Sequence, residues 1–342
     1  MRLACLTSLV FLCLYVIEFG LSSFLFPDRS GILDRETVGK TLYAVGPRQA
    51  AYGFQRLSNA EKKIVFVGES NVELGFRPVQ LVEFFPGVDI HNIAYGGMNM
   101  RERRQMVELI LSKVPETDRG KLTIVMGIWY GSFVDDSRHW NGGPTSLEGE
   151  MLRYGLYREN HGNLPVARFN DALMPYAILM AKPFMLSSRV LLEDRVTKML
   201  KSMEYSNPNS NQDSRLVTKQ YQGQAIANLK DKMGPVTAWS TEGFNTLYSI
   251  AREVSLSGAN FVLIDMPIPT WHRNGVPHDH VYQARLAPLL VKMALLPRFS
   301  YASMREDFTD ESYYYDHAHP RPEITRKWAS KVAPIIKSSI AP

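Results

Sequence analysis

The sequence predicts an α/β fold built on a parallel, doubly wound sheet. Short apolar runs rich in β-branched and aromatic residues are typical of buried parallel strands, and they occur at residues 64–67, 88–94, 122–126 and 261–265. Segments with helical spacing follow or separate these runs, at residues 76–85, 100–114, 241–255, 282–296 and 322–336. Strands that alternate with helices of this length indicate a sheet covered by helices.

The stretch from Ile64 to Gly75 contains the clearest local pattern. After the apolar run, Gly68 permits a tight turn, and Ser70 lies just past the carboxyl end of the strand. Pro78 suits the first turn of a helix that follows. A strand, a sharp turn with Ser and a helix is one way in which α/β folds present a nucleophile. The alternative is that Ser70 is only a turn or helix-capping residue.

Composition excludes several classes of protein. With 342 residues, 45% hydrophobic and 21% charged, the chain can bury a large core. The net charge of +5 is mild, and no Lys/Arg run is interleaved with aromatics, so we expect no nucleic-acid partner. The only cysteines are Cys5 and Cys13, so the rest of the chain has no disulfide, thiolate metal site or Cys nucleophile.

The N-terminus reads as a membrane anchor. Leu3 to Phe26 is apolar apart from a few Ser and Thr residues and Glu18, and Arg2 precedes it. That length suits a helix that crosses a bilayer, and the preceding positive charge favours a cytoplasmic start. A secretory signal peptide is the competitor, but the segment lacks a small-x-small cleavage site. We therefore expect an uncleaved single-pass anchor over residues 1–26, with the remaining chain on the periplasmic or extracellular side of the cell membrane.

The rest of the chain divides into a stalk and one domain. Residues 27–62 mix Gly, Pro and charge, and predict a stalk or entry segment. Residues 63–342 form the α/β domain, but the strand–helix rhythm lapses at about 140–240. This insertion is either a cap over the domain or a source of further helices, with candidates at residues 187–203 and 217–229.

A second chemical pattern precedes the last helix. In Asp316-His317-Ala318-His319, the spacing places the Asp316 carboxylate within reach of the His319 imidazole. Such a carboxylate fixes the tautomer and stabilises imidazolium, so His319 can take a proton from a Ser hydroxyl. Ser70 joins this pair only if both segments end at the same edge of the sheet, which a doubly wound sheet permits.

Three short motifs together resemble the SGNH (GDSL-type) hydrolase superfamily: Gly68-Glu69-Ser70, Asn92-x-x-x-x-Gly97 and Asp316-x-x-His319. The resemblance covers residues 61–135 and 241–340, but not the insertion. It implies a flavodoxin-like three-layer fold and a serine esterase or O-acyltransferase without a cofactor. It also implies that Ser70, Asp316 and His319 are catalytic, and that the backbone N–H groups of Ser70 and Gly97 hold the oxyanion.

The third block departs from the family. Where Gly-x-Asn-Asp is common, this chain has Gly127-Ile128-Trp129-Tyr130, so Trp129 replaces an oxyanion donor. Loss of one such donor costs two to three orders of magnitude in rate. Side chains that could compensate or bind substrate are Asn71, Trp129, Tyr130, Trp271 and His272. Trp271 could instead simply cover the core.

The layout of an anchor followed by such a domain is similar to envelope polymer acylation proteins of the teichoic-acid D-alanylation, alginate acetylation and cellulose acetylation types. This likeness implies a polysaccharide or related polymer as substrate, and a polytopic membrane O-acyltransferase as partner. It leaves hydrolysis and transfer open. The alternative is a catalytically silent accessory subunit of a polymer acylation or export complex.

Two other clusters carry weaker signals. Five of the eight histidines lie between residues 272 and 319, but their spacing matches no metal motif, so we expect no metal. Arg101, Arg103 and Arg104 could contact an anionic polymer, but we expect a solvated helix face.

Overall fold

The computed structural model describes residues 2–25, 57, 61–94, 96–133, 157–160, 163–167, 217–236, 239 and 241–340. Almost all of the stalk predicted at 27–62 lies outside these residues, as do most of the insertion and its candidate helix at 187–203. The division of the chain into these segments therefore stays a prediction.

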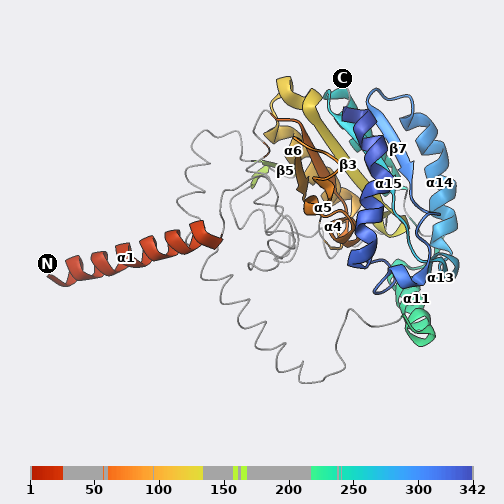
Figure 1. Ribbon diagram of the computed structural model, residues 1–342, viewed down its shortest axis with the longest axis horizontal. Coiled ribbons are helices and arrows are strands. Elements are labelled where there is room, and N and C mark those ends of the chain that lie inside the picture. The colour runs from red at the N-terminus through yellow and green to blue at the C-terminus, as the bar shows by residue number, and fades with distance from the viewer. Residues whose placement is uncertain are drawn as a thin grey trace.

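A sheet of five parallel strands forms the centre of the molecule (Figure 1). Its strands, β1 to β3, β6 and β7, span Lys63–Val67, Asp89–Asn92, Leu122–Ile128, Asn260–Asp265 and Phe299–Ser303, and their order is β2-β1-β3-β6-β7. Every residue of β1, β3 and β6 is buried, as expected for parallel strands with helices on both faces. The predicted α/β fold with a parallel sheet is confirmed.

The strand order creates the crevice that positions the site. The chain runs from β1 outward to β2, then returns to add β3 on the other side of β1. This reversal is the switch point of a sheet with the flavodoxin-like order, where the connections diverge beyond the carboxyl ends of the strands. The loops that follow β1, β2 and β3 therefore meet around one opening.

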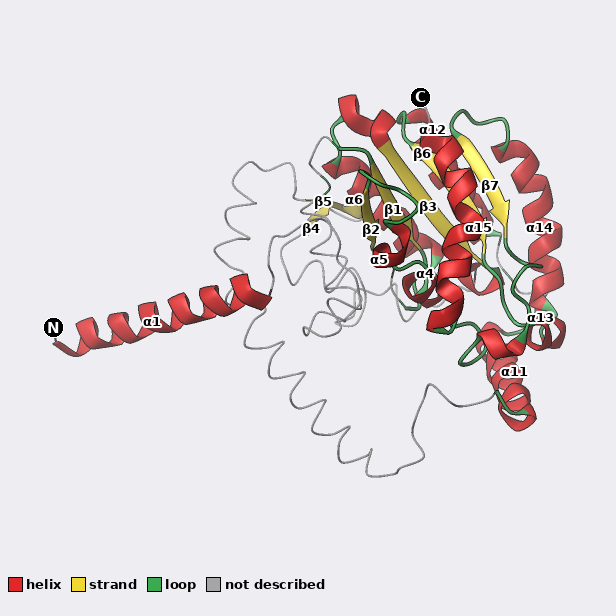
Figure 2. Ribbon diagram, in the orientation of Figure 1, coloured by secondary structure: helices red, strands yellow, loops and turns green. Residues whose placement is uncertain are grey.

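The helices cover the two faces of the sheet (Figure 2). On one face α6 (Met100–Lys113), α12 (Glu242–Leu256) and α14 (His278–Met293) pack together, while α15 (Pro322–Ile340) packs on the other face with α4 (Ser70–Gly75) and α5 (Pro78–Leu81). The remaining helices are α11 (Lys219–Met233) and α13 (Thr270–Gly275), which contact each other. Short 3-10 turns occupy Glu116–Lys121, Tyr130–Phe133 and Glu311–Tyr313.

The helix predicted at 76–85 is wrong in its extent. The chain forms α4 and the four-residue α5 instead, separated by Phe76 and Arg77. Pro78 explains the break, because proline lacks an N–H group and disfavours the helical conformation in the residue before it. Arg77 is accordingly extended, with φ −84° and ψ 121°.

Three strands were not predicted. β7 is an edge strand whose residues are mostly half-exposed, so it lacks the continuous apolar run that identified β1, β3 and β6. Within the insertion, β4 (Tyr157–Asn160) and β5 (Asn163–Ala167) pair antiparallel as a separate two-stranded sheet.

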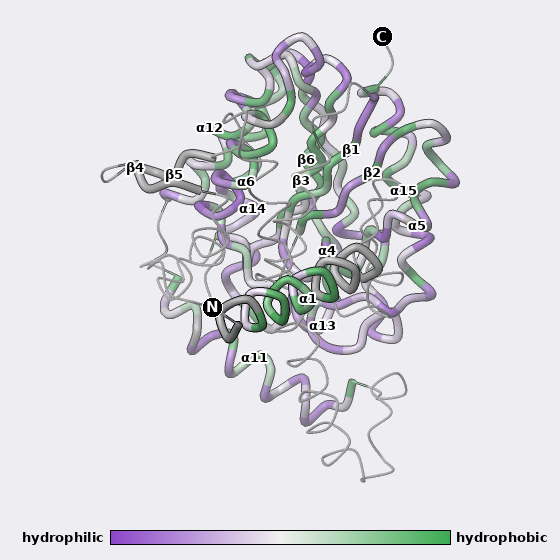
Figure 3. Tube along the Cα trace, turned by 90° about the vertical axis from the view of Figure 1, so that its left-hand side faces the viewer, coloured by the Kyte–Doolittle hydropathy of each residue, from purple (hydrophilic) through white to green (hydrophobic). Residues whose placement is uncertain are grey.

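The N-terminal segment is one helix, α1 (Arg2–Leu25). Apolar side chains from Leu6 to Ile17 are exposed, with Phe11 at 61%, and the trace of α1 is coloured as hydrophobic there (Figure 3). Among the residues that the structure describes, no helix has both the length and the apolar character needed to cross a membrane. The transmembrane anchor predicted for residues 1–26 is therefore not confirmed.

Candidate active site

Ser70 begins α4 because the chain can turn tightly after β1. A Cβ on Gly68 would lie 2.4 Å from Cγ2 of Val72, and one on Gly127 would lie 2.3 Å from the same atom. Only glycine at both positions lets α4 pack against the ends of β1 and β3. Gly68 is thus needed for close approach and not for a left-handed backbone.

Asn92 brings the second loop to the nucleophile. At the end of β2, its Nδ2 donates to the carbonyls of Val72, at 3.0 Å, and Phe76, at 2.7 Å, and its Oδ1 accepts from the N–H of Ala94. These bonds fasten β2 to the carboxyl end of α4. The turn that follows contains Gly97, whose φ of 80° suits glycine, and Gly97 lines the same cavity as Ser70.

The loop before α15 completes a hydrogen-bonded chain. His319 Nε2 lies 2.6 Å from Ser70 Oγ, and His319 Nδ1 lies 2.6 Å from Asp316 Oδ2. The other Asp316 oxygen accepts the backbone N–H groups of Ala318 and His319, each at 2.9 Å. The structure thus brings together the three residues whose spacing predicted a triad, while their catalytic role stays a prediction.

The charge on Asp316 favours one tautomer of the His319 ring. Burial opposes ionisation of Asp316, but the hydrogen bond and charge of His319 outweigh it and hold the pKa of the carboxyl well below its usual range. An ionised carboxylate only accepts, so Nδ1 of His319 carries the proton. In the neutral ring, Nε2 is then left to accept the Ser70 hydroxyl.

A cavity of about 200 Å³ opens beside Ser70. Its described lining combines polar groups near the nucleophile with an apolar wall, which consists of Met98, Trp129, Leu229 and Met233. Leu229 and Met233 come from α11, so the insertion contributes to the site. The cavity is therefore polar beside Ser70 and His319 and apolar on the side of α11.

Glu69 and Arg103 form a buried ion pair behind the nucleophile. Arg103 is fully buried, and its guanidinium donates to Glu69 Oε1 at 2.6 Å, to the Gly127 carbonyl at 2.7 Å and to Ser132 Oγ at 2.8 Å. The prediction of a solvated face is therefore wrong for Arg103, since the helix turns it toward the sheet. Arg101 and Arg104 do form partly exposed pairs, with Glu242 and Glu108.

Trp129 replaces the expected Asn without replacing its function. Its indole N–H donates to Glu69 Oε2 at 2.8 Å, so this donor is already engaged. The side chain is 7% exposed and lines the cavity. Trp129 consequently contributes an aromatic wall to the cavity, while its indole N–H is engaged by Glu69.

The other candidate binding residues lie outside the cavity lining that the structure describes. Tyr130 and His272 are fully buried and hydrogen-bond to each other, and Trp271 stacks on the His272 ring with centroids 5.6 Å apart. Asn71 is 1% exposed, and its amide has no hydrogen-bond partner among the described residues.

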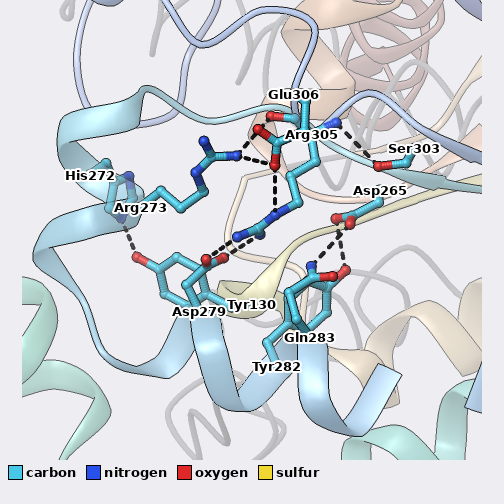
Figure 4. A network of polar contacts seen from close by, with 10 residues as sticks. All are labelled: Tyr130, Asp265, His272, Arg273, Asp279, Tyr282, Gln283, Ser303, Arg305 and Glu306. Carbon is cyan, nitrogen blue, oxygen red and sulfur yellow. Dashed lines mark hydrogen bonds and ion pairs between the residues drawn. The ribbon is translucent and has the colours of Figure 1, made fainter. Parts of the chain in front are cut away.

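A second polar network lies at the ends of β6 and β7 (Figure 4). Asp265 accepts from the Tyr282 hydroxyl at 2.8 Å and from Gln283 at 3.2 Å, while Asp279 forms a bidentate pair with Arg305. Burial raises the pKa of Asp265 to about 6, and the two hydrogen bonds oppose that rise. Among the described residues, no group of three or more His, Cys, Asp or Glu is arranged to hold a metal ion.

Three parts of the site were not predicted: Glu69, Arg103, and the α11 wall formed by Leu229 and Met233. Glu69 adjoins Ser70, and Arg103 falls on the helical stripe of Val107 and Ile110, which are buried. That spacing was the available signal for a buried Arg. No comparable sequence pattern predicts that Leu229 and Met233 line the cavity, because their position depends on the path of the insertion.

Comparison with known proteins gives little. No protein-family model matches the chain, and no curated protein sequence matches it. Among solved structures, the chain is similar to a Bacteroides fragilis protein described as a candidate acylhydrolase, with 11% identity, 86% of this chain and 97% of that chain covered, and a TM-score of 0.42. A likeness at this level carries no conclusion about the reaction.

Proposed function

We propose that this protein is a serine acyl-transfer enzyme of the SGNH hydrolase type. The observation that carries the proposal is the continuous chain from Ser70 Oγ through the His319 ring to Asp316, at the wall of a cavity. A hydroxyl, an imidazole and an ionised carboxylate in this order are the parts that nucleophilic acyl transfer requires.

The first half of the reaction forms an acyl-enzyme. Ser70 Oγ attacks the ester carbonyl while its proton passes to His319 Nε2, and the ionised Asp316 stabilises the imidazolium. The N–H groups of Ser70 and Gly97 have no hydrogen-bond partner within the described residues and are the proposed donors to the oxyanion. Collapse breaks the ester C–O bond, and His319 gives the proton to the departing alcohol.

The second half decides between hydrolysis and transfer. Water or an acceptor hydroxyl attacks the acyl-enzyme and His319 accepts its proton. The bond between the acyl carbon and Ser70 Oγ then breaks, and His319 returns the proton to Ser70 Oγ. Transfer needs a site that positions an acceptor and excludes water. The flat face of Trp129 beside the cavity supports a sugar acceptor, so we favour an O-acyl group on a cell-surface polysaccharide and lean toward transfer.

The cellular setting of this reaction is a proposal from the sequence. The likeness of the chain's layout, an apolar N-terminal segment followed by such a domain, to envelope polymer acylation proteins supports a place at the outer side of the cell membrane, beside a polytopic O-acyltransferase. Fractionation of cells and N-terminal sequencing of the mature protein test this. A soluble protein that begins near residue 27 would contradict membrane attachment, without bearing on the chemistry of Ser70.

One observation favours a second candidate, the catalytically silent accessory subunit. Because Glu69 engages the Trp129 indole, the site lacks a side-chain donor at the position of the family's Asn. A donor of that kind contributes roughly 10²–10³ in rate. A chain with only backbone donors could retain the triad geometry and serve to bind polymer.

Reaction with a fluorophosphonate separates the two candidates. We expect the purified full-length chain to form one adduct, mapped by mass spectrometry to Ser70, and we expect Ser70→Ala and His319→Ala to abolish it. His280→Ala is the matched histidine control, because His280 is exposed on α14, and it should react like the wild type. No labelling of the wild type would favour the silent subunit.

Substrate assays then test the polymer assignment. The chain is incubated with an acetylated oligosaccharide and with a small chromogenic ester, with and without unmodified oligosaccharide as acceptor. Acetylated acceptor supports transfer, and free acetate alone means an esterase. Fast turnover of the small ester with no action on any oligosaccharide would refute the polymer as substrate.

A further inference from the structure

The loop that carries Asp316 and His319 is attached to the rest of the fold by a buried histidine. His272, on α13, lies with its Nδ1 2.5 Å from the carbonyl oxygen of His317, which is between the two triad residues in the chain. The His272 side chain is fully buried. The imidazole end of this contact is therefore buried, while the contact as a whole is partly buried.

The partners of His272 define its protonation state. A carbonyl only accepts, so Nδ1 must carry a proton and donate it. Burial lowers the pKa of His272 to about 3, and the neighbouring His317 acts in the same direction, so the ring is neutral and its Nε2 accepts. The donor to Nε2 is the Tyr130 hydroxyl (Figure 4). Burial raises the pKa of Tyr130 well above its usual range, so it remains a donor.

These hydrogen bonds connect the loop that carries Asp316 and His319, here called the base loop, to the sheet. Tyr130 lies two residues after the end of β3, in the 3-10 turn Tyr130–Phe133. Its ring and that of His272 meet edge to face with centroids 5.4 Å apart, and Trp129 contacts both rings. Aromatic packing thus limits rotation of the imidazole, while the two hydrogen bonds fix its orientation.

We propose that His272 and Tyr130 are positioning residues, which hold the His317 carbonyl and thereby place His319 against Ser70. The proposal rests on the proposed function, since it assigns these residues to the alignment of the general base. The 2.6 Å contact between His319 Nε2 and Ser70 Oγ depends on where the loop lies. Misplacement of a reacting group by about 1 Å can cost roughly 10²-fold in rate.

Three substitutions test the bridge, which is the pair of hydrogen bonds from Tyr130 to His272 and from His272 to the His317 carbonyl. His272→Leu removes both hydrogen bonds of the imidazole. Tyr130→Phe removes only the hydrogen bond from the Tyr130 hydroxyl to His272, and His272→Gln retains one donor and one acceptor. With a small chromogenic ester, His272→Leu should lower kcat about 10- to 100-fold and change KM less than about twofold, since His272 lies outside the described cavity lining. Tyr130→Phe should lower kcat less, and His272→Gln should recover most of the loss.

A buried histidine elsewhere provides the matched control. His278 is 1% exposed and packs edge to face on Trp239, with no contact to the base loop among those that the structure describes. His278→Leu should lower the thermal unfolding midpoint as His272→Leu does, but leave kcat near that of the wild type. Equal losses of kcat in the two Leu variants would reduce His272 to a stability role and overturn the proposal.

A spectroscopic readout keeps this test independent of activity. A proton held between His319 Nδ1 and Asp316 gives a low-field proton resonance, which His319→Ala assigns by its absence. We expect His272→Leu to broaden or shift this resonance and His272→Gln to preserve it. An unchanged resonance in His272→Leu would refute the bridge, whether or not the wild type is active. An inactive wild type in which His272→Leu shifts the resonance as expected would refute only the proposed function.

Discussion

Arg103 and Arg101 lie on the same turn of α6 but meet opposite environments. Arg103 is fully buried against Glu69, whereas the Arg101 side chain is 34% exposed and pairs with a half-exposed Glu242. Removing one partner of a buried pair leaves an uncompensated charge, while an exposed pair contributes little. The two arginines therefore form an internal comparison for the ion pair behind Ser70.

Arg103→Met should lower the free energy of unfolding by about 3–5 kcal/mol, and Arg101→Met by less than about 1 kcal/mol. Urea unfolding at neutral pH measures both. Adding Glu69→Gln to Arg103→Met should recover part of the loss, because no buried charge is then left without a partner. Equal effects of the two Arg substitutions would contradict the buried pair.

At the residue scale, the sequence brought out the candidate catalytic residues better than the residues that support them. Ser70, Asp316 and His319 belong to short motifs whose local spacing already restricts where they point. Glu69 and Trp129 bond to each other across 60 positions, and such a contact has no local signature. Tyr130 and His272 were predicted as candidate substrate-binding residues, but the sequence alone did not show that they hydrogen-bond to each other outside the described cavity lining.

The junction of β1 and α4 depends on two glycines that contact one valine. A Cβ at position 68 would lie 2.4 Å from Val72 Cγ2 and 2.8 Å from Val72 Cβ. Overpacking of this kind costs roughly 1–3 kcal/mol. Because Ser70 lies between these residues in the chain, strain at the junction should also move the nucleophile.

Gly68→Ala should thus lower both the free energy of unfolding, by about 1–3 kcal/mol, and the rate of phosphonate labelling. Val72→Ala in the same chain should relieve the contact, so that the double variant is more stable than the sum of the single losses predicts. Gly120→Ala is the control, since its Cβ would meet nothing within 4 Å. Strict additivity of the two losses would argue against the contact.

Whole elements were predicted where one residue pattern dominated. α6 was predicted nearly to its ends because its apolar residues recur with regular helical spacing. The capping box of Asn99 and Glu102 at its start was not part of that prediction. The prediction of one helix at 76–85 was wrong because the apolar spacing continues through Pro78, whereas the helical backbone is interrupted just before it. β7 was missed because an edge strand has one neighbour and does not need a continuous apolar run.

For the whole molecule, the parallel sheet could be anticipated from the sequence, but the order of its strands could not. Alternating strands and helices made a parallel sheet the expected fold, and that sheet brings the loops after β1 and β2 to one edge. The joining of Ser70 with residues 316–319 required a strand order that the sequence does not specify. The α11 wall depended on the path of the insertion, most of which lies outside the described residues.

The buried network at the end of β6 should make the stability of the whole fold depend on pH. Asp265 is 1% exposed, and its pKa is raised from 3.8 to about 6, chiefly by burial. The folded state therefore binds this proton more tightly than the unfolded state does. The stabilisation is fully present below pH 3.8 and is lost as pH rises through about 6. At about 1.4 kcal/mol per pKa unit, the loss is of the order of 3 kcal/mol.

Asp265→Asn should remove this dependence, because an amide stays neutral while its oxygen still accepts from Tyr282. The free energy of unfolding, measured by urea at pH 4 and pH 7, should fall with rising pH by about 2.4 kcal/mol more in the wild type than in the variant. Asp310→Asn is the control of opposite sign. Hydrogen bonds from Ser312 lower the pKa of exposed Asp310, so its contribution is lost as pH falls. If Asp265→Asn instead destabilises the fold equally at both pH values, the Asp265 carboxyl is already ionised across that range, and its burial does not control the stability of the sheet.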